Sequence, residues 1–140
     1  MKNIEMTDQL QTEIIETFDM FDDWLEKYQY IIDLGKQLEP MSDEFKVDAN
    51  ILQGCQSQVW LVHDYQNGVL NFQANSDAAI VSGLIHLVMT IYSGKNPQTI
   101  LDTEPDFIAK IGLSAHLSST RSNGLNAMIE KIKTTAQNYL

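Results

Sequence analysis

The sequence predicts an α+β fold, because helical and strand-like patterns occupy different stretches of the chain. Apolar residues recur at spacings of three and four over residues 8–38, as in an amphipathic helix. Residues 56–65 alternate imperfectly between apolar and polar side chains, and Asn67-Gly68 follows, the strongest short signal for a β-hairpin. Helical patterns return after this hairpin. We therefore expect a small antiparallel sheet of about three strands packed against several helices.

Chain length and composition indicate one ordinary domain. The 140 residues are near the commonest domain size, and no repeat or low-complexity linker divides them. We therefore expect a single domain over residues 1–140. The chain contains no apolar stretch long enough for a membrane span, and residues 1–5 do not begin an apolar signal segment. A cytoplasmic protein without membrane contact is expected.

Acidic residues are concentrated in the N-terminal third of the chain. Of the net charge of −10, residues 1–50 hold 13 acidic and 4 basic side chains, whereas residues 51–140 hold 6 and 5. Phosphate backbones are repelled by such a surface, so nucleic-acid binding is not expected. A basic protein partner is compatible with this charge. Solubility alone is the more ordinary explanation of it.

The first helical region admits two interpretations. Asp22 or Asp23 is a good helix N-cap, so residues 8–38 form either one helix or two helices with a corner between them. Gly35 and Pro40 are expected to end the helical region. The apolar stripe that favours a single helix consists of Ile14, Phe18, Phe21, Leu25, Tyr28 and Ile32.

Turn and cap residues delimit the later elements. Residues 48–52, 56–65 and the stretch after Gly68 are the three expected strands. Ser76 is a good N-cap for a helix that runs from Asp77 to about Tyr92. Further helices are expected at residues 97–101 and 105–111, and from Ser118 onward with Leu125, Met128, Ile129 and Ile132 on the buried side.

Cys55 is the only cysteine, and its surroundings favour a thiol that is presented for chemistry. Gly54 before it permits a backbone shape that other residues resist, while Gln56 and Ser57 after it offer hydrogen bonds. The cysteine is expected in a tight turn between the first two strands. An inert buried thiol is the commoner case by composition, and the local sequence moves the balance toward a reactive one. A single cysteine cannot form an internal disulfide.

A reactive thiol acts as the thiolate, which a nearby positive charge stabilises. No lysine or arginine lies within eight residues of Cys55, so a positive partner must come from elsewhere. Arg121, the only arginine, is the natural candidate, although a surface ion pair is the commoner role. His116 is expected in a polar loop and could be the base of a Cys–His enzyme. The spacing of cysteine and histidines predicts no metal site.

Four groups of segments occur in the order and spacing of a known family. They are Trp24 to Tyr30 with Ile32-Asp33-Leu34-Gly35; Asn50, Leu52, Gly54-Cys55-Gln56-Ser57 and Val59-Trp60; Phe72, Ser76-Asp77-Ala78, Ile80-Val81 and Gly83-Leu84; and His116-Leu117-Ser118, Arg121 and Asn123-Gly124-Leu125. On these segments, the chain resembles the SufE family of sulfur acceptors, which serve cysteine desulfurases in iron–sulfur cluster assembly. The resemblance covers about residues 20–135. Ser119 departs from it, because the family often has proline there, but serine is acceptable in a first helical turn.

The resemblance implies a fold similar to that of iron–sulfur scaffold proteins and a sulfur-transfer accessory protein rather than an enzyme. Cys55 would accept persulfide sulfur from a cysteine desulfurase, stimulate that enzyme, and pass the sulfur to a downstream iron–sulfur scaffold. The carrier, a monomer or a homodimer, would need no cofactor or metal of its own, since the desulfurase holds the pyridoxal phosphate. The residues expected to support Cys55 are Gly54, Gln56, Ser57, Asp77, His116 and Arg121.

Two other functions stay open at this point. One is a thiol enzyme with Cys55 as nucleophile and His116 as base. The other is an interaction module that activates a desulfurase without carrying sulfur. For the carrier, we expect Leu52 and Val59 to shelter Cys55 in the free protein, and the loop to swing out at Gly54 when a partner docks.

Overall fold

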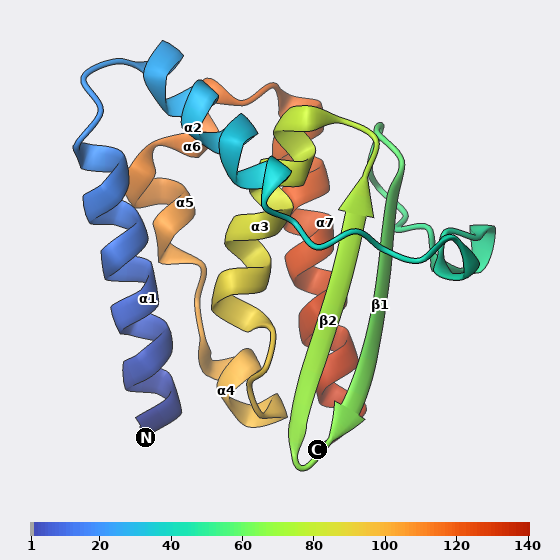
Figure 1. Cartoon of the computed structure of the whole chain (residues 1–140). Coiled ribbons are helices and arrows are strands. Elements are labelled where there is room, and N and C mark those ends of the chain that lie inside the picture. The colour runs from blue at the N-terminus through green and yellow to red at the C-terminus, as the bar shows by residue number, and fades with distance from the viewer. Residues whose placement is uncertain (1) are drawn as a thin grey trace.

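The computed structural model describes residues 2–140 and has the expected α+β architecture, with a β-hairpin packed on helices (Figure 1). The strands are β1 (Val59–Gln66) and β2 (Val69–Ser76). Two 3-10 turns precede them, η1 (Asp43–Phe45) and η2 (Asp48–Asn50). The α-helices are α1 (Lys2–Asp19), α2 (Trp24–Lys36), α3 (Ala79–Tyr92), α4 (Pro97–Asp102), α5 (Asp106–Ile111), α6 (Leu113–His116) and α7 (Ser119–Gln137).

The N-terminal helical region consists of two helices, which confirms the second of the two interpretations. Asp23 is the N-cap of α2, and its carboxylate accepts a hydrogen bond from the backbone N–H of Glu26 at 2.9 Å. The corner changes the helical phase, so the predicted stripe is wrong at Leu25, whose side chain is 79% exposed. Ile31 and Leu34 are the residues of α2 that are buried.

Gly35 does not end a helix, contrary to the prediction, but lies inside α2 where this helix crosses α3. A Cβ atom at Gly35 would lie 2.8 Å from the backbone nitrogen of Gly83, and one at Gly83 would lie 1.9 Å from the carbonyl oxygen of Ile31. The two glycines therefore allow the helix backbones to approach each other more closely than side chains would permit. This crossing places α3 at the centre of the molecule (Figure 1).

The hairpin turn forms at Asn67-Gly68, as predicted. Both residues have positive φ, 54° and 82°, as a type I′ turn requires, and β1 and β2 pair antiparallel along their length. The expected third strand is reduced to a single antiparallel bridge between Ile51 and Trp60. The preceding residues 48–50 form η2 instead, so the sheet has two strands rather than about three.

Ser76 ends β2 and does not cap α3, which begins at Ala79. The Ser76 hydroxyl donates a hydrogen bond to the carbonyl oxygen of Gln58 at 2.8 Å and accepts one from the N–H of Ala78 at 3.2 Å. The serine thus joins the end of β2 to the residue before β1. This bond fixes one end of the loop that contains Cys55.

The last helix begins as the sequence predicts. The Ser118 hydroxyl accepts a hydrogen bond from the backbone N–H of Arg121 at 3.2 Å, which places the N-cap one residue before α7. The start of α7 and the start of β1 lie at the same end of the molecule, opposite the two termini (Figure 1). The predicted buried side of α7 is confirmed at Leu125, Met128, Ile129 and Ile132.

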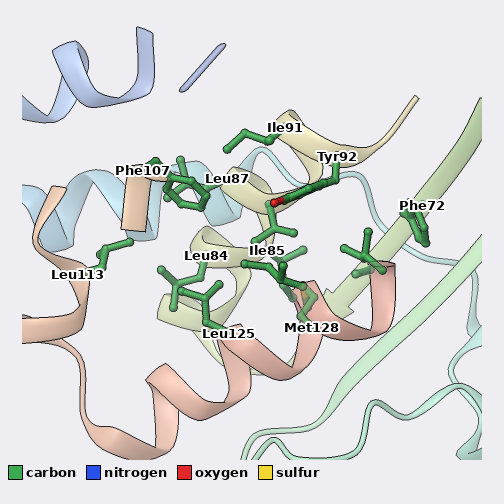
Figure 2. Close-up of a cluster of buried hydrophobic side chains, with 14 of the residues drawn as sticks. Phe72, Leu84, Ile85, Leu87, Ile91, Tyr92, Phe107, Leu113, Leu125 and Met128 are labelled. Atoms are coloured by element: carbon green, nitrogen blue, oxygen red, sulfur yellow. The ribbon is translucent and has the colours of Figure 1, made fainter. Parts of the chain in front are cut away.

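Side chains of α3 and α7 meet in the core. Figure 2 shows Leu84 and Ile85 of α3 beside Leu125 and Met128 of α7, and all four are buried. These apolar contacts hold the two helices together. No helix within residues 2–140 has the length and hydropathy to cross a membrane.

Candidate functional site

Cys55 lies in a loop of residues 52–58, which we call the Cys55 loop. The loop is closed at its base, where the N–H of Leu52 donates a hydrogen bond to the carbonyl oxygen of Val59 at 2.8 Å. Leu52 and Val59 are buried. Gly54 has a φ of +92°, a conformation that other residues rarely adopt. The chain therefore turns sharply just before the cysteine, as the sequence predicts.

The Cys55 loop contacts two small residues of α7. Cys55 Sγ lies 3.7 Å from the carbonyl oxygen of Gly124, so the thiol donates a weak hydrogen bond to the helix backbone. A Cβ atom at Gly54 would lie 3.2 Å from Cβ of Ala127. Because Gly124 and Ala127 are three residues apart, they lie on the same face of α7.

A cavity of about 300 Å³ lies beside the thiol, between the Cys55 loop, α3 and the start of α7. Its apolar wall comes from Val59, Val81, Leu84, Ile85, Leu125 and Met128. Its polar lining comes from Gln56, Ser57, Ser118, Thr120 and Arg121. The cavity thus has the sulfur atom of Cys55 at its edge, one apolar wall and one polar wall, and it lies at the N-terminal end of α7.

Cys55 is half-buried, and this burial raises the pKa of its thiol above the usual value of 9.0. The cause is desolvation, which disfavours the charged thiolate. The thiol is therefore protonated at neutral pH in this conformation. Arg121 is exposed and is the only charged residue among the described residues that line the cavity.

The structure brings together some of the residues predicted for the site. Gln56, Ser57 and Arg121 line the cavity with Cys55, and Gly54 shapes the loop. Asp77 is exposed and does not line the cavity.

His116 also lies away from the cavity, and it ends the short helix α6 rather than lying in a polar loop. Its ring stacks on Trp24 with 3.9 Å between centroids, and its carbonyl oxygen accepts a hydrogen bond from the hydroxyl of Tyr28. Among the described residues, no histidine lines the Cys55 cavity: His63 contacts Tyr139, and His86 lines a different pocket with Met89 and Thr90. The arrangement therefore does not supply the imidazole that a Cys–His enzyme needs.

Sequence reasoning missed the contact with Gly124. An isolated glycine inside a helical pattern often has a packing reason, and that signal could have identified it. Ser118 was predicted only as a helix cap, yet it also lines the cavity. No group of three or more histidine, cysteine, aspartate or glutamate side chains within residues 2–140 is arranged to hold a metal ion.

The fold and site define a small α+β protein that holds one half-buried thiol in a loop beside a cavity. The SufE family, described as an Fe-S metabolism associated domain, matches residues 12–136. An uncharacterized SufE-like protein of Rhizobium meliloti is 44% identical over 133 residues, which cover 91% of this chain and 95% of that protein. A second SufE-like protein, from Rhizobium etli, is 42% identical over 130 residues, which cover 89% and 88%. The chain therefore belongs to the SufE family.

A solved structure supports the fold independently. The solution structure of a hypothetical protein from Thermus thermophilus matches with a TM-score of 0.74, covering 92% of this chain and 94% of that one. The two sequences are 18% identical, so this likeness concerns the fold alone. Family membership links the chain to Fe–S metabolism.

Proposed function

We propose that the protein is a sulfur carrier that accepts persulfide sulfur from a cysteine desulfurase on Cys55 and delivers it to an iron–sulfur scaffold. The observation that carries the proposal is the single thiol, held on a sharp loop beside a cavity, in a family associated with Fe–S metabolism. The pyridoxal phosphate of the reaction belongs to the desulfurase, and the carrier acts without a cofactor of its own.

The transfer step is an exchange between a thiol and a persulfide. The Cys55 thiolate attacks the outer sulfur of the desulfurase persulfide and forms a new S–S bond. The S–S bond of the desulfurase persulfide breaks, and its cysteine leaves as a thiolate. The proton that Cys55 lost is matched by the proton that the leaving thiolate takes up, so the exchange consumes no oxidant or reductant.

The cavity is suited to sheltering the product. A persulfide is readily reduced or oxidised in solution, so a carrier benefits from keeping it away from small reactants. The cavity of about 300 Å³ far exceeds the roughly 10–15 Å³ that one water molecule needs, so an added sulfur atom fits. The positive charge of the Arg121 guanidinium favours a persulfide anion in this cavity.

The resting conformation protects the thiol rather than activating it. Burial keeps Cys55 protonated, whereas attack on a persulfide requires a thiolate with free access. Docking of the desulfurase must therefore expose the Cys55 loop, and Gly54, with its positive φ, is the residue where the loop can turn.

Intact-mass analysis tests the carrier function. The protein is mixed with a cysteine desulfurase, pyridoxal phosphate and cysteine, and the same reaction is run with Cys55→Ser. We expect a mass gain of one or more sulfur atoms that reductant reverses and that Cys55→Ser lacks. If no sulfur is gained, and Cys55→Ser stimulates the desulfurase as well as the original chain does, the protein is an activating module and not a carrier.

A further inference from the structure

We propose that Gly124 is a positioning residue: its bare backbone lets the Cys55 loop dock on α7, and its carbonyl oxygen holds the thiol of Cys55 in the protonated form. The purpose of this docking rests on the proposed carrier function. The docking itself is a property of the free protein and can be measured without any desulfurase.

The first observation is the space around Gly124. A Cβ atom at this position would lie 3.2 Å from Cys55 Sγ and 3.8 Å from both Cα and Cβ of Cys55. A contact of 3.2 Å is closer than ordinary van der Waals contact, so any side chain at residue 124 pushes against the sulfur. With a side chain at residue 124, Cys55 Sγ or the loop that carries it would have to move away from α7 by a few tenths of an ångström.

The second observation is the neighbouring contact. Gly54 approaches Ala127 so closely that a Cβ atom on the glycine would lie 3.2 Å from Cβ of the alanine. The loop therefore touches α7 at two places on one helix face, and a small residue is present at each. Two independent close contacts show that the loop is packed on the helix.

Gly124 lowers the stability of helix α7, and its close contact with Cys55 explains why a glycine is present there. Glycine inside a helix is less favourable than alanine, because it loses more backbone freedom on folding. α7 extends from Ser119 to Gln137, so residue 124 lies well within it. Alanine would stabilise the isolated helix, yet here its Cβ atom would press on Cys55 Sγ.

The hydrogen bond from the thiol gives the contact a chemical consequence. A carbonyl oxygen accepts from S–H but repels a thiolate, so the position at 3.7 Å from Gly124 favours the protonated thiol. Arg121 of α7 acts in the opposite sense, and it is the only charged residue among the described residues lining the cavity. When the loop leaves α7, the sulfur loses the carbonyl and gains solvent, and both changes favour the thiolate.

Alkylation of the free protein tests the proposal. The rate of Cys55 alkylation by iodoacetamide is measured against pH for the full chain, for Gly124→Ala, and for Asn126→Ala as a control with an exposed residue of the same helix. We expect Gly124→Ala to react several-fold faster near neutral pH, with its rate profile shifted to lower pH. Asn126→Ala should match the original chain. A Gly124→Ala profile identical to that of the original chain overturns the proposal.

A second pair of variants addresses the other contact. Ala127→Leu should raise the alkylation rate in the same way, and Ala127→Gly should leave it unchanged. If circular dichroism shows that Gly124→Ala does not fold, the two Ala127 variants test the proposal instead. Equal alkylation rates for Ala127→Leu and Ala127→Gly would then overturn it. The mass experiment on the original chain is separate, so its failure would remove the carrier function and leave the alkylation result intact.

Discussion

The imidazole of His116 stacks on the indole of Trp24, with the ring centroids 3.9 Å apart and the planes 16° from parallel. The stack joins α6 to the start of α2, two elements that are distant in sequence. It uses the histidine ring for packing rather than aiming it at Cys55. We infer that His116 supports the fold and does not act on the thiol.

Substitution of His116 checks this role. His116→Ala removes the stack, which in aromatic pairs is worth about 0.5–1.5 kcal/mol beyond area burial, so the free energy of unfolding should fall by about 1 kcal/mol. His116→Phe should keep most of that stability. Chemical denaturation measures both variants, and sulfur uptake should be unchanged in each. A loss of sulfur uptake in the stable His116→Phe variant would show that His116 takes part in the sulfur transfer.

The crossing of α2 and α3 predicts a large stability effect. Gly83→Ala would place a Cβ atom 1.9 Å from the carbonyl oxygen of Ile31, so the helices must separate. Overpacking of a core typically costs about 1–3 kcal/mol, and this backbone collision should reach or exceed the upper end. Ser82→Ala, beside it on α3, should change stability far less. Denaturation midpoints compare the two, and equal values would contradict the close crossing.

His86 should make stability depend on pH. Burial lowers the pKa of His86 below its usual 6.5, and its Nδ1 atom is buried without a hydrogen-bond partner among the described residues. As the pH falls, the unfolded chain takes up this proton before the folded chain does. The stability associated with neutral His86 is therefore complete above about pH 6.5 and is lost as the pH falls through the folded-state value.

Thermal unfolding of His86→Leu measures this contribution. The drop in melting temperature between about pH 8 and about pH 5 should be larger for the original chain than for the variant, because leucine does not titrate. His63→Leu, which changes an exposed histidine, is the control. Identical pH dependence in the original chain and His86→Leu would show that His86 does not contribute.

Local signals predicted much of the fold. Asn67-Gly68 identifies the hairpin and Ser118 identifies the start of α7, because each depends on residues that are adjacent in sequence. Gly35 was misread, since its role depends on Gly83 of another helix. The third strand was overestimated because Asp48 and Asn50, which disfavour a strand, form a 3-10 turn and leave only Ile51 to pair with Trp60.

For the site too, local features could be predicted from the sequence, whereas contacts between distant residues could not. The sharp turn at Gly54 is a local property, and the structure has it. The contact between Cys55 and Gly124 joins residues that are 69 positions apart. Hydrophobic periodicity and helix caps are local sequence signals, so neither of them predicts a contact over this distance. Arg121 was a candidate because a thiolate is stabilised by a positive charge and the sequence around Cys55 contains none. This argument rests on chemistry and not on a sequence pattern. His116 was a candidate on another chemical ground, as the base of a Cys–His enzyme, but its ring stacks on Trp24 instead.

Exposure of Cys55 should depend on the partner. The half-buried thiol, with its raised pKa, should react slowly with iodoacetamide at neutral pH, and the rate should rise strongly when a cysteine desulfurase is added. An unrelated protein at equal concentration controls for crowding. Rapid alkylation of the free protein would contradict a protected resting state.

Arg121 provides the sharpest test of the chemistry in the cavity. Its guanidinium is the only positive group among the described residues that line the cavity, so Arg121→Ala should slow sulfur uptake on Cys55 several-fold. Because Arg121 is exposed, its loss should leave the denaturation midpoint nearly unchanged. Arg121→Lys should keep part of the rate, since lysine keeps the positive charge but lacks the planar guanidinium group. Lys131→Ala, an exposed change elsewhere on α7, is the control for net charge, and a slowing equal to that of Arg121→Ala would mean that overall charge, not position, is responsible.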